Sequence, residues 1–300
     1  MYIKYTHFFY ILPQGFLRNC QMEILNVSNL CKTYPSFTLD HVSFSLEKGY
    51  IMGFIGRNGA GKTTTLKSML RFVHPDSGTV TINGFNVEKD EFAVKNCIGF
   101  VSGLDGFYSS KKIKQVTDVT KRFFSNWDNE LYKNLLKKFN LDENKLIKNL
   151  SAGMKVKYQI ALAMSHKASL LLLDEPTSGL DPVSRDELIL LFQDYVADGE
   201  HSILFSTHVI SDLEKCADYI TYIKNGKILD SCDTVSFKEK YLLVSGKKDD
   251  LDESRRQKLI GLHCHNFGFE GMILSQDKML FSDCEISTPT MEEIMIHTER

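Results

Sequence analysis

The order of apolar and polar residues changes several times along the chain, and each change predicts different elements. Between residues 22 and 48 the two kinds alternate, as in Val42–Leu46, which predicts antiparallel strands with one buried face. Runs of mainly apolar residues follow at 50–55, 170–173 and 203–207. Such short runs are typical of strands buried on both faces. We therefore expect an α/β protein. Other short strands are expected at 79–83, 97–101, 220–223 and 227–229.

A helical pattern occupies residues 111–166, where apolar side chains recur at intervals of three and four. Packing between helices explains this stripe, and the lysines opposite it are expected to face solvent. A further helix is expected at 182–197, and the pair Asn225-Gly226 predicts a type I′ hairpin. The stripe consists of Phe123, Phe124, Trp127, Leu131, Leu135, Leu136 and Phe139.

The C-terminal part of the chain has no sustained period. After about residue 230, acidic residues cluster, and short helical and β-like runs alternate. We interpret residues 232–300 as a small α+β accessory domain in which no chemistry is visible. Its expected elements are helices at 254–259 and 289–295 and strands at 262–266, 271–275 and 278–281.

The first 21 residues differ from everything that follows. They are rich in aromatic residues, show no clear period and precede Met22. One hypothesis is that translation starts at Met22 and that residues 1–21 are not native, which the intact mass of the natively expressed protein would decide. The most lipophilic stretch, Phe8–Leu12, is too short to span a bilayer and lacks a convincing signal-peptide cleavage site.

Composition limits the function without choosing it. A chain of 300 residues with 43% hydrophobic and 25% charged residues is ordinary for a soluble globular protein of one or two domains. A net charge of −2 gives no electrostatic case for nucleic acid as the main partner. The seven cysteines are spread singly, which predicts free thiols in a reducing compartment. No second cluster with ligand spacing accompanies His263-Cys264-His265, so we interpret this run as a strand.

The stretch Gly56–Thr63 (GRNGAGKT) carries the strongest chemical signal. It fits the pattern G-x-x-x-x-G-K-[ST], with a predicted strand before it and a predicted helix start at 64–70. Glycines let backbone N–H groups turn toward phosphate oxygens, and a helix N-terminus adds positive charge. We expect Lys62 to reach the β- and γ-phosphates of a nucleotide and Thr63 to bind Mg²⁺. The expected nucleotide-binding residues here are Gly56, Arg57, Asn58, Gly59, Ala60, Gly61, Lys62, Thr63 and Thr64.

Two of the buried strands deliver polar side chains at their C-terminal ends. The first ends in Asp174 and Glu175, and the second is followed by His208. Open α/β sheets bind their ligands at this edge, so we expect these side chains to lie near the phosphate loop. Phosphoryl transfer requires stabilised charge, in-line geometry and a positioned water, which indicates nucleotide hydrolysis.

Together these motifs resemble those of the nucleotide-binding subunit of an ATP-binding cassette (ABC) transporter. Leu150–Met154 (LSAGM) resembles the family signature LSGGQ, and Leu170–Glu175 resembles the Walker B strand with its catalytic glutamate. The D-loop is matched by Ser178, Gly179, Leu180 and Asp181. Order and intervals fit across residues 22–231. The resemblance implies a P-loop cassette with a RecA-like core, an antiparallel β subdomain and a helical subdomain at about 103–168.

The resemblance also implies roles for single residues. Glu175 would polarise the attacking water as general base, and His208 would bridge Glu175 and the γ-phosphate region. Asp174 and Thr63 would hold the Mg²⁺ shell. Tyr34 stands where the family stacks an aromatic ring on adenine, although an aromatic in a β-region is as often core. The signature residues, which would face ATP on a partner cassette, are Ser151, Ala152, Gly153 and Met154.

The implied assembly contains more than this chain. Because the sequence carries one set of motifs, a second cassette, identical or different, would complete an ATP-bound dimer. ATP and Mg²⁺ are the implied cofactors, and a separate multi-spanning permease is the implied membrane partner. The chain would then be cytoplasmic and peripheral on the inner face of the cell membrane, with no nucleic acid expected.

Three positions depart from the family pattern. Ala152 replaces a signature glycine, and its Cβ would crowd the phosphate unless φ is negative. Met154 replaces a glutamine, and Gly103 stands where the family has its Q-loop glutamine. These variants resemble the exporter-type branch paired with ABC-2-like membrane subunits, which favours export. Phe107 and Tyr108 fit either a permease-docking surface or packing within the helical subdomain.

Two alternatives stay open. Soluble ABC proteins that act on ribosomes or DNA usually carry two cassettes or long coiled coils, and this sequence shows one cassette without sustained heptads. A regulatory switch with little hydrolysis is disfavoured by the intact phosphate loop and carboxylates, whereas Gly103 and Met154 favour it. Multiple-turnover ATPase assays would distinguish a regulatory switch from an ATPase that hydrolyses ATP repeatedly.

Overall fold

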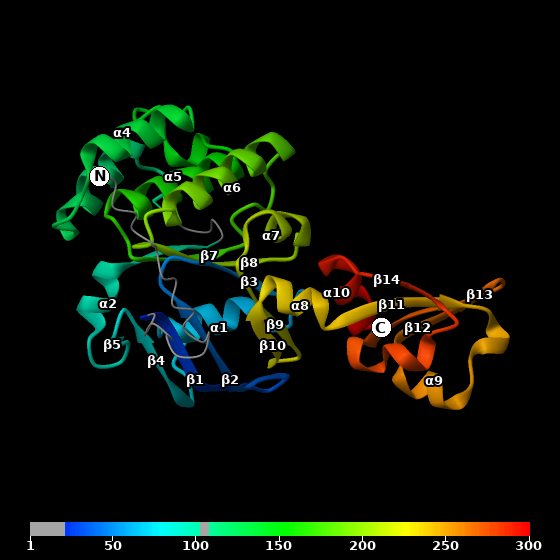
Figure 1. The fold of residues 1–300 in the computed structure, drawn as a ribbon. Helices are drawn as coiled ribbons and strands as arrows, with labels where there is room; N and C mark the ends of the chain where they lie inside the picture. The colour runs from blue at the N-terminus through cyan, green and yellow to red at the C-terminus, as the bar shows by residue number, and fades with distance from the viewer. Residues whose placement is uncertain (1–21, 103–107) are drawn as a thin grey trace, which may run out of the picture.

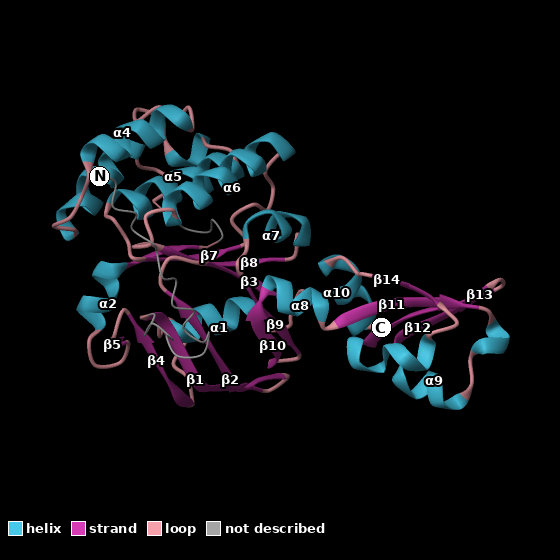
Figure 2. Ribbon diagram, viewed as in Figure 1, coloured by secondary structure: helices cyan, strands magenta, loops and turns pink. Residues whose placement is uncertain are grey.

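The computed structural model describes residues 22–102 and 108–300. The chain forms a mixed α/β structure with three sheets (Figure 1). The longer helices lie on one side of the central sheet, and the antiparallel sheet and the helix after the phosphate loop lie on the other, with the third sheet to one side (Figures 1 and 2). The predicted features at Gly103 and Phe107 fall outside the described residues.

The first sheet is antiparallel, as its alternating sequence predicts, and has the order β2-β1-β4-β5. Val42, Phe44 and Leu46 on β2 are buried, whereas the residues between them are at least partly accessible. The sheet therefore buries one face, which packs toward the phosphate-loop region. Its strands are β1 (Glu23–Tyr34), β2 (Phe37–Glu47), β4 (Ser77–Ile82) and β5 (Phe85–Asn86).

The central sheet has the order β10-β9-β3-β8-β7-β6, and its pairs are parallel except for the β9–β10 hairpin. Asn225 and Gly226 have φ values of 48° and 77°, as the predicted type I′ turn requires. Every residue of β3, β7 and β8 is buried. The strands are β3 (Ile51–Ile55), β6 (Ile98–Val101), β7 (Leu170–Asp174), β8 (Ser202–Thr207), β9 (Tyr219–Lys224) and β10 (Lys227–Asp233).

Both faces of the central sheet carry a hydrophobic core, which explains the unbroken apolar runs. Ile51 and Ile55 of β3 join one core with the long helices, whereas Met52 and Phe54 join a second core beneath. Successive strand residues point to opposite faces, so both sets must be apolar. The helices around this sheet are α1 (Lys62–Met69), α2 (Glu91–Cys97), α3 (Ile113–Thr120), α4 (Asn129–Lys138), α5 (Ala152–Ser165), α6 (Pro182–Val196) and α7 (Ile210–Cys216).

The predicted aromatic and aliphatic stripe is only partly a packing surface. Leu135, Leu136 and Phe139 are buried, whereas Phe123 is 71% exposed. Packing is therefore the wrong prediction for Phe123, because this residue belongs to a short 3₁₀ turn, η1 (Lys121–Phe123), and not to α4. A second 3₁₀ turn, η2 (Ile147–Asn149), precedes the signature segment.

The third sheet has the order β12-β13-β11-β14 and is antiparallel. The strand expected at 278–281 is wrong: these residues form a 3₁₀ turn that inserts Phe281 into a small core. His263-Cys264-His265 lies on a strand as expected, and no metal-binding cluster occurs among the described residues. The elements are α8 (Thr234–Glu239), β11 (Tyr241–Gly246), η3 (Lys248–Asp250), α9 (Glu253–Lys258), β12 (Ile260–His265), β13 (Gly268–Leu274), η4 (Ser275–Phe281), β14 (Glu285–Ser287) and α10 (Met291–Glu299).

Helix α10 fastens the third sheet to the rest of the chain. Met291 and Ile294 are fully buried and belong to the same core as the long helices. The Tyr222 hydroxyl donates to Glu299 Oε1 at 2.8 Å, and Lys224 Nζ donates to the Thr298 carbonyl at 2.6 Å. None of the helices in the described ranges is long and apolar enough to cross a membrane.

Candidate nucleotide site

The phosphate loop joins β3 to α1, as the sequence predicts. Gly61 begins the helix with φ at 116°, a left-handed conformation that side chains disfavour, and a Cβ there would lie 2.8 Å from the Phe37 ring. A Cβ on Gly56 would lie 2.4 Å from the Ile223 carbonyl oxygen. Steric contacts therefore require glycine at both ends of the loop. The first N–H groups of α1 directly follow the loop, and a helix N-terminus favours an anion.

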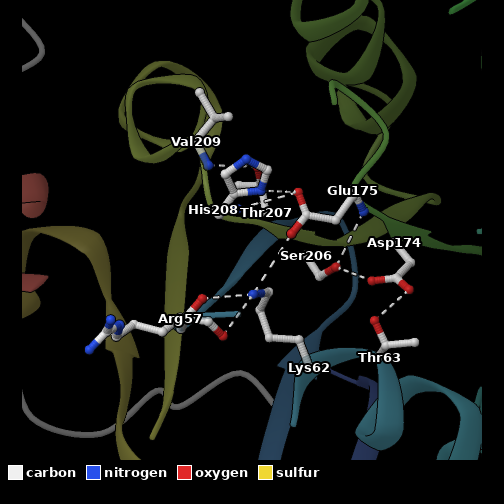
Figure 3. Close-up of polar contacts among 10 residues, drawn as sticks. Arg57, Lys62, Thr63, Asp174, Glu175, Ser206, Thr207, His208 and Val209 are labelled. Carbon is white, nitrogen blue, oxygen red and sulfur yellow. Dashed lines mark hydrogen bonds and ion pairs between the residues drawn. The ribbon is translucent and has the colours of Figure 1, made fainter. Parts of the chain in front are cut away.

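Lys62 lies across the centre of the loop and is only 6% exposed. Its Nζ donates to the Gly56 carbonyl at 2.7 Å and to the Arg57 carbonyl at 3.3 Å (Figure 3). Glu175 Oε1 lies 3.7 Å from the same Nζ. Burial lowers the pKa of Lys62, and the charges of Glu175 and Asp174 oppose that shift. The carboxylates therefore help to keep a cation in the loop.

Asp174, at the end of β7, has both carboxylate oxygens occupied. Thr63 Oγ1 donates to Oδ2 at 2.8 Å, and Ser206 Oγ donates to Oδ1 at 2.6 Å (Figure 3). Asp174 is 9% exposed, so its charge is largely screened from water by protein. A hydroxyl and a carboxylate at hydrogen-bond distance form the oxygen donor set that Mg²⁺ prefers. Thr63 and Asp174 therefore fit the expected metal.

Glu175 follows Asp174, and its side chain points toward His208, the residue after β8. Its φ is 55°, a left-handed conformation that costs a non-glycine residue about 1 kcal/mol or more. Its backbone N–H donates to the Ser206 carbonyl at 2.9 Å, which holds this turn. His208 Nδ1 lies 2.6 Å from Glu175 Oε2 (Figure 3). The buried sheet thus brings together two side chains that are 33 positions apart.

A cavity of about 700 Å³ lies beside the loop, and most of the predicted nucleotide-binding and catalytic residues line it. Gly56 and Ala60 do not line it: Gly56 packs against Ile223, and Ala60 donates its N–H to the Arg57 carbonyl at 3.1 Å. Tyr34 lines this cavity and is 37% exposed. The lining residues are Tyr34, Pro35, Ser36, Phe37, Arg57, Asn58, Gly59, Gly61, Lys62, Thr63, Thr64, Glu175 and His208.

The signature segment lies outside this cavity. Ser151 is the N-cap of α5, where its hydroxyl accepts the Met154 N–H at 3.2 Å. A Cβ on Gly153 would lie 2.4 Å from Leu180 Cδ2, so this glycine allows the signature helix to contact the D-loop. Ala152 is exposed and has no positive φ, so its methyl group is tolerated in the helix. None of these residues lines the described phosphate-loop cavity.

The D-loop lies between Glu175 and α6. Gly179 adopts a left-handed φ of 75°, and Asp181 caps α6 by accepting the N–H groups of Val183 and Ser184. These interactions fix the backbone conformation of the loop without any contact to the cavity. Ser178 and Asp181 are exposed, and Leu180 is buried against the signature helix.

Comparison with known proteins agrees with this geometry. The sequence model described as "ABC transporter" matches residues 39–178. The ABC transporter ATP-binding protein YtrB of Bacillus subtilis is 32% identical over 206 residues, which cover 69% of this chain and 70% of that protein. The chain belongs to the ATP-binding proteins of ABC transporters. Its activity is ATP hydrolysis coupled to transport.

Other relatives place this ABC ATPase within the same fold and family. The bacitracin transport ATP-binding protein BcrA of Bacillus licheniformis is 33% identical over 210 residues, covering 69% of both chains. A solved ATP-binding subunit of an ABC transporter superposes with a TM-score of 0.66 at 24% identity, covering 72% of this chain and 92% of that one. A nucleotide-free ATP-binding cassette superposes with a TM-score of 0.61 at 20% identity. These structures support the predicted P-loop cassette fold.

Sequence reasoning missed two parts of the site. Pro35, Ser36 and Phe37 line the cavity because the β1–β2 turn bends over the phosphate loop, a contact between distant segments that no local pattern reveals. Ser206 contacts both carboxylate residues, although the motifs do not include it. Its signal is a hydroxyl that follows three apolar residues in a fully buried strand, because a buried polar group needs a hydrogen-bond partner.

Proposed function

We propose that this ABC ATPase forms an ATP-bound dimer of cassettes that powers export by a separate membrane permease. The observation that carries the proposal is the position of the signature helix, which lies outside the cavity of the chain's own phosphate loop. A helix N-terminus attracts anions, so Ser151 and Gly153 are suited to a phosphate held by a second cassette. The second cassette is a copy of this chain or a different chain of the same family.

The residues around the cavity divide the work of hydrolysis. Glu175 acts as general base on the attacking water, and His208, 2.6 Å from it, holds its carboxylate in place. Lys62 neutralises phosphate charge from the centre of the loop. Thr63 and Asp174 would hold Mg²⁺, which, when bound, supplies positive charge next to the phosphates. Tyr34, which lines the cavity, contacts the base of the nucleotide.

Two observations support a membrane partner and export. Relatives include BcrA, a bacitracin transport protein, and the Nod factor export ATP-binding protein I of Ralstonia nicotianae, which is 31% identical over 210 residues. Phe72, which is 59% exposed, also lines a groove between the end of α1 and α2, and Phe92 on α2 is 80% exposed. Tyr108 is 62% exposed, which favours docking over internal packing. We assign the permease contact to this side and place the chain peripherally on the membrane.

The domain organisation completes the proposal. Residues 22–231 form the cassette, with a helical subdomain at about 103–168, and residues 232–300 form an accessory domain. The third sheet has its own small core around Phe269 and Phe281, which supports a boundary near residue 232. The accessory domain reaches the cassette through α10, whose Glu299 lies 3.9 Å from Arg57 of the phosphate loop.

A pull-down tests the assembly. The tagged Glu175→Gln protein is captured from solubilised native membranes with Mg-ATP, and the co-purifying chains are identified. We expect a stoichiometric multi-spanning protein and, in solution, an ATP-dependent doubling of mass by light scattering. The tagged Lys62→Ala protein, which should not bind ATP, is the control for nucleotide dependence of the dimer. Capture of ribosomal or DNA-bound material without a membrane protein would refute the transport assembly.

A further inference from the structure

Ser206 places a buried hydroxyl between the two carboxylate residues of the site. It is the second-last residue of β8, the strand that lies between the phosphate-loop strand β3 and the Walker B strand β7. In the sheet it pairs with Phe54 on one side and with Asp174 on the other. Ser206 has no exposed surface, so its hydroxyl is fully removed from water. Such a group is costly unless it is hydrogen-bonded.

The hydroxyl contacts both acidic residues. Ser206 Oγ donates to Asp174 Oδ1 at 2.6 Å, a short bond of the kind that charge-assisted O–H donors make (Figure 3). The backbone nitrogen of Glu175 lies 3.3 Å from Ser206 Oγ and 2.9 Å from the Ser206 carbonyl oxygen. One residue thus fixes the side chain of Asp174 and the backbone of Glu175.

This arrangement orients the carboxylate of Asp174. The bond from Ser206 occupies Oδ1, so the carboxylate plane is set with Oδ2 on the phosphate-loop side, where Thr63 Oγ1 meets it at 2.8 Å. Without the serine hydroxyl, Oδ1 would be buried without this partner, and the carboxylate could rotate. A group held through a neighbour in this way is positioned before the nucleotide arrives.

The same residue supports the unusual backbone of Glu175. A left-handed φ of 55° persists at a non-glycine residue only where the surroundings determine it. The two contacts from the Glu175 N–H to Ser206 restrain this backbone conformation, in which the Glu175 side chain points toward His208. Loosening them would move the base relative to the attacking water.

We propose that Ser206 is a positioning residue for ATP hydrolysis: its hydroxyl orients Asp174 toward the cation site at Thr63 and anchors the backbone of Glu175. The inference rests on the proposed roles of Asp174, Thr63 and Glu175. Ser206 touches no reacting atom itself, so its effect is transmitted through these neighbours. It should influence turnover and the response to Mg²⁺ more than the affinity for nucleotide.

The chain provides a matched control on the same strand. Ser202 is also fully buried, and its hydroxyl accepts the Gly49 N–H at 2.8 Å, at the end of β8 remote from the carboxylates. Ser202→Ala and Ser206→Ala therefore remove the same atom from the same strand. Only the second removes a contact to the acidic residues.

The experiment compares wild type, Ser202→Ala, Ser206→Ala and Ser206→Thr in three measurements: steady-state ATPase kinetics, Mg²⁺ titration of the rate, and binding of a fluorescent ATP analogue with Mg²⁺ or with EDTA. For Ser206→Ala we expect kcat about tenfold lower, the effect of losing one hydrogen bond to a charged group. KM for ATP should change less than about threefold. Half-maximal activation should need more Mg²⁺, and analogue affinity should fall with Mg²⁺ but not with EDTA.

The remaining variants decide whether the hydroxyl itself matters. Ser206→Thr keeps the hydroxyl and should recover most of the rate and the Mg²⁺ response, and Ser202→Ala should resemble wild type in all three measurements. Wild-type kcat and Mg²⁺ response in Ser206→Ala would overturn the inference, as would equal losses in both alanine variants. If Ser206→Ala does not fold, Ser206→Cys replaces it, and full activity with its weak S–H donor would be equally contradictory.

Failure of this inference is distinguishable from failure of the proposed function. Glu175→Gln is measured in parallel. If that variant turns over normally, the assignment of the general base is wrong. If it is inactive while Ser206→Ala behaves as wild type, the base stands and only the positioning role of Ser206 is lost.

Discussion

Replacing Glu175 by glutamine is the most direct test of the chemistry. The substitution removes one negative charge and keeps the volume of the side chain. Glutamine can still meet His208 Nδ1, 2.6 Å away in the structure, so the local fold should survive. What it loses is the basicity needed to accept a proton from water.

The expected size of the effect follows from the role of the residue. A positioned general base contributes about 10² to 10⁴ in rate, so kcat should fall at least about 100-fold. This corresponds to about 2.7 kcal/mol in the activation barrier. Nucleotide affinity should persist because Lys62, buried in the loop, keeps its two carbonyl contacts. Slow hydrolysis with intact binding should trap the ATP-bound dimer.

Phosphate release under multiple turnover gives the rate, and light scattering gives the mass with ATP. Glu187→Gln is the matched control, because Glu187 is half-exposed on α6 and lies 3.6 Å from Lys157 Nζ. We expect the control to change kcat less than about twofold, as for most surface substitutions. Near-normal turnover of Glu175→Gln would refute the assignment of the base. Loss of ATP binding in this variant would show instead that its charge serves the nucleotide affinity.

Three further substitutions test the loop, a helix contact and a buried histidine. Lys62→Ala should abolish ATP binding in a fluorescence titration, whereas Lys67→Ala, on the exposed side of the same helix, should not. Ile294→Ala should lower the free energy of unfolding by about 2–5 kcal/mol in a denaturant titration, because Ile294 is fully buried in the main core. Ile296→Ala, 44% exposed, should cost much less. Burial lowers the pKa of His166 from 6.5 to about 4, so the unfolded chain binds a proton in that interval that the native protein does not. Stability from this group is present above pH 6.5 and is lost as the pH falls toward 4, by about 3 kcal/mol in total. His166→Phe keeps a ring stacked on Phe124 and should flatten the unfolding free energy across that interval.

Each of these tests has a clear contrary result. ATP binding by Lys62→Ala would mean that the loop holds phosphate through its backbone alone. Equal destabilisation by the alanine variants of Ile294 and Ile296 would contradict the buried anchoring face of α10. An unchanged pH dependence in His166→Phe would show that other groups dominate acid unfolding.

Local chemistry made much of this protein predictable. The phosphate loop, the buried strands and the acids at the end of β7 are encoded within short stretches, because turn geometry and burial on both faces restrict which residues fit there. The Asn225-Gly226 hairpin is local in the same sense. For these elements the sequence alone determined both the structure and the expected chemistry.

Tertiary packing decided the features that local patterns could not. Phe123 continues an apolar stripe in the sequence, yet a 3₁₀ turn leaves it exposed. Residues 278–281 resemble a strand, but Phe281 is drawn into the core of the third sheet, and β11 supplies the strand beside β13 instead. Propensity is weak in short segments, so the available core position determines their conformation.

The catalytic arrangement shows the same division. The sequence alone determined that Asp174, Glu175 and His208 follow buried strands. It did not determine the contact of Ser206 with both acids, because that contact requires β7 and β8 to be neighbours in register. Parallel pairing joins segments that are 32 positions apart, and only the folded sheet brings a buried hydroxyl to a buried carboxylate.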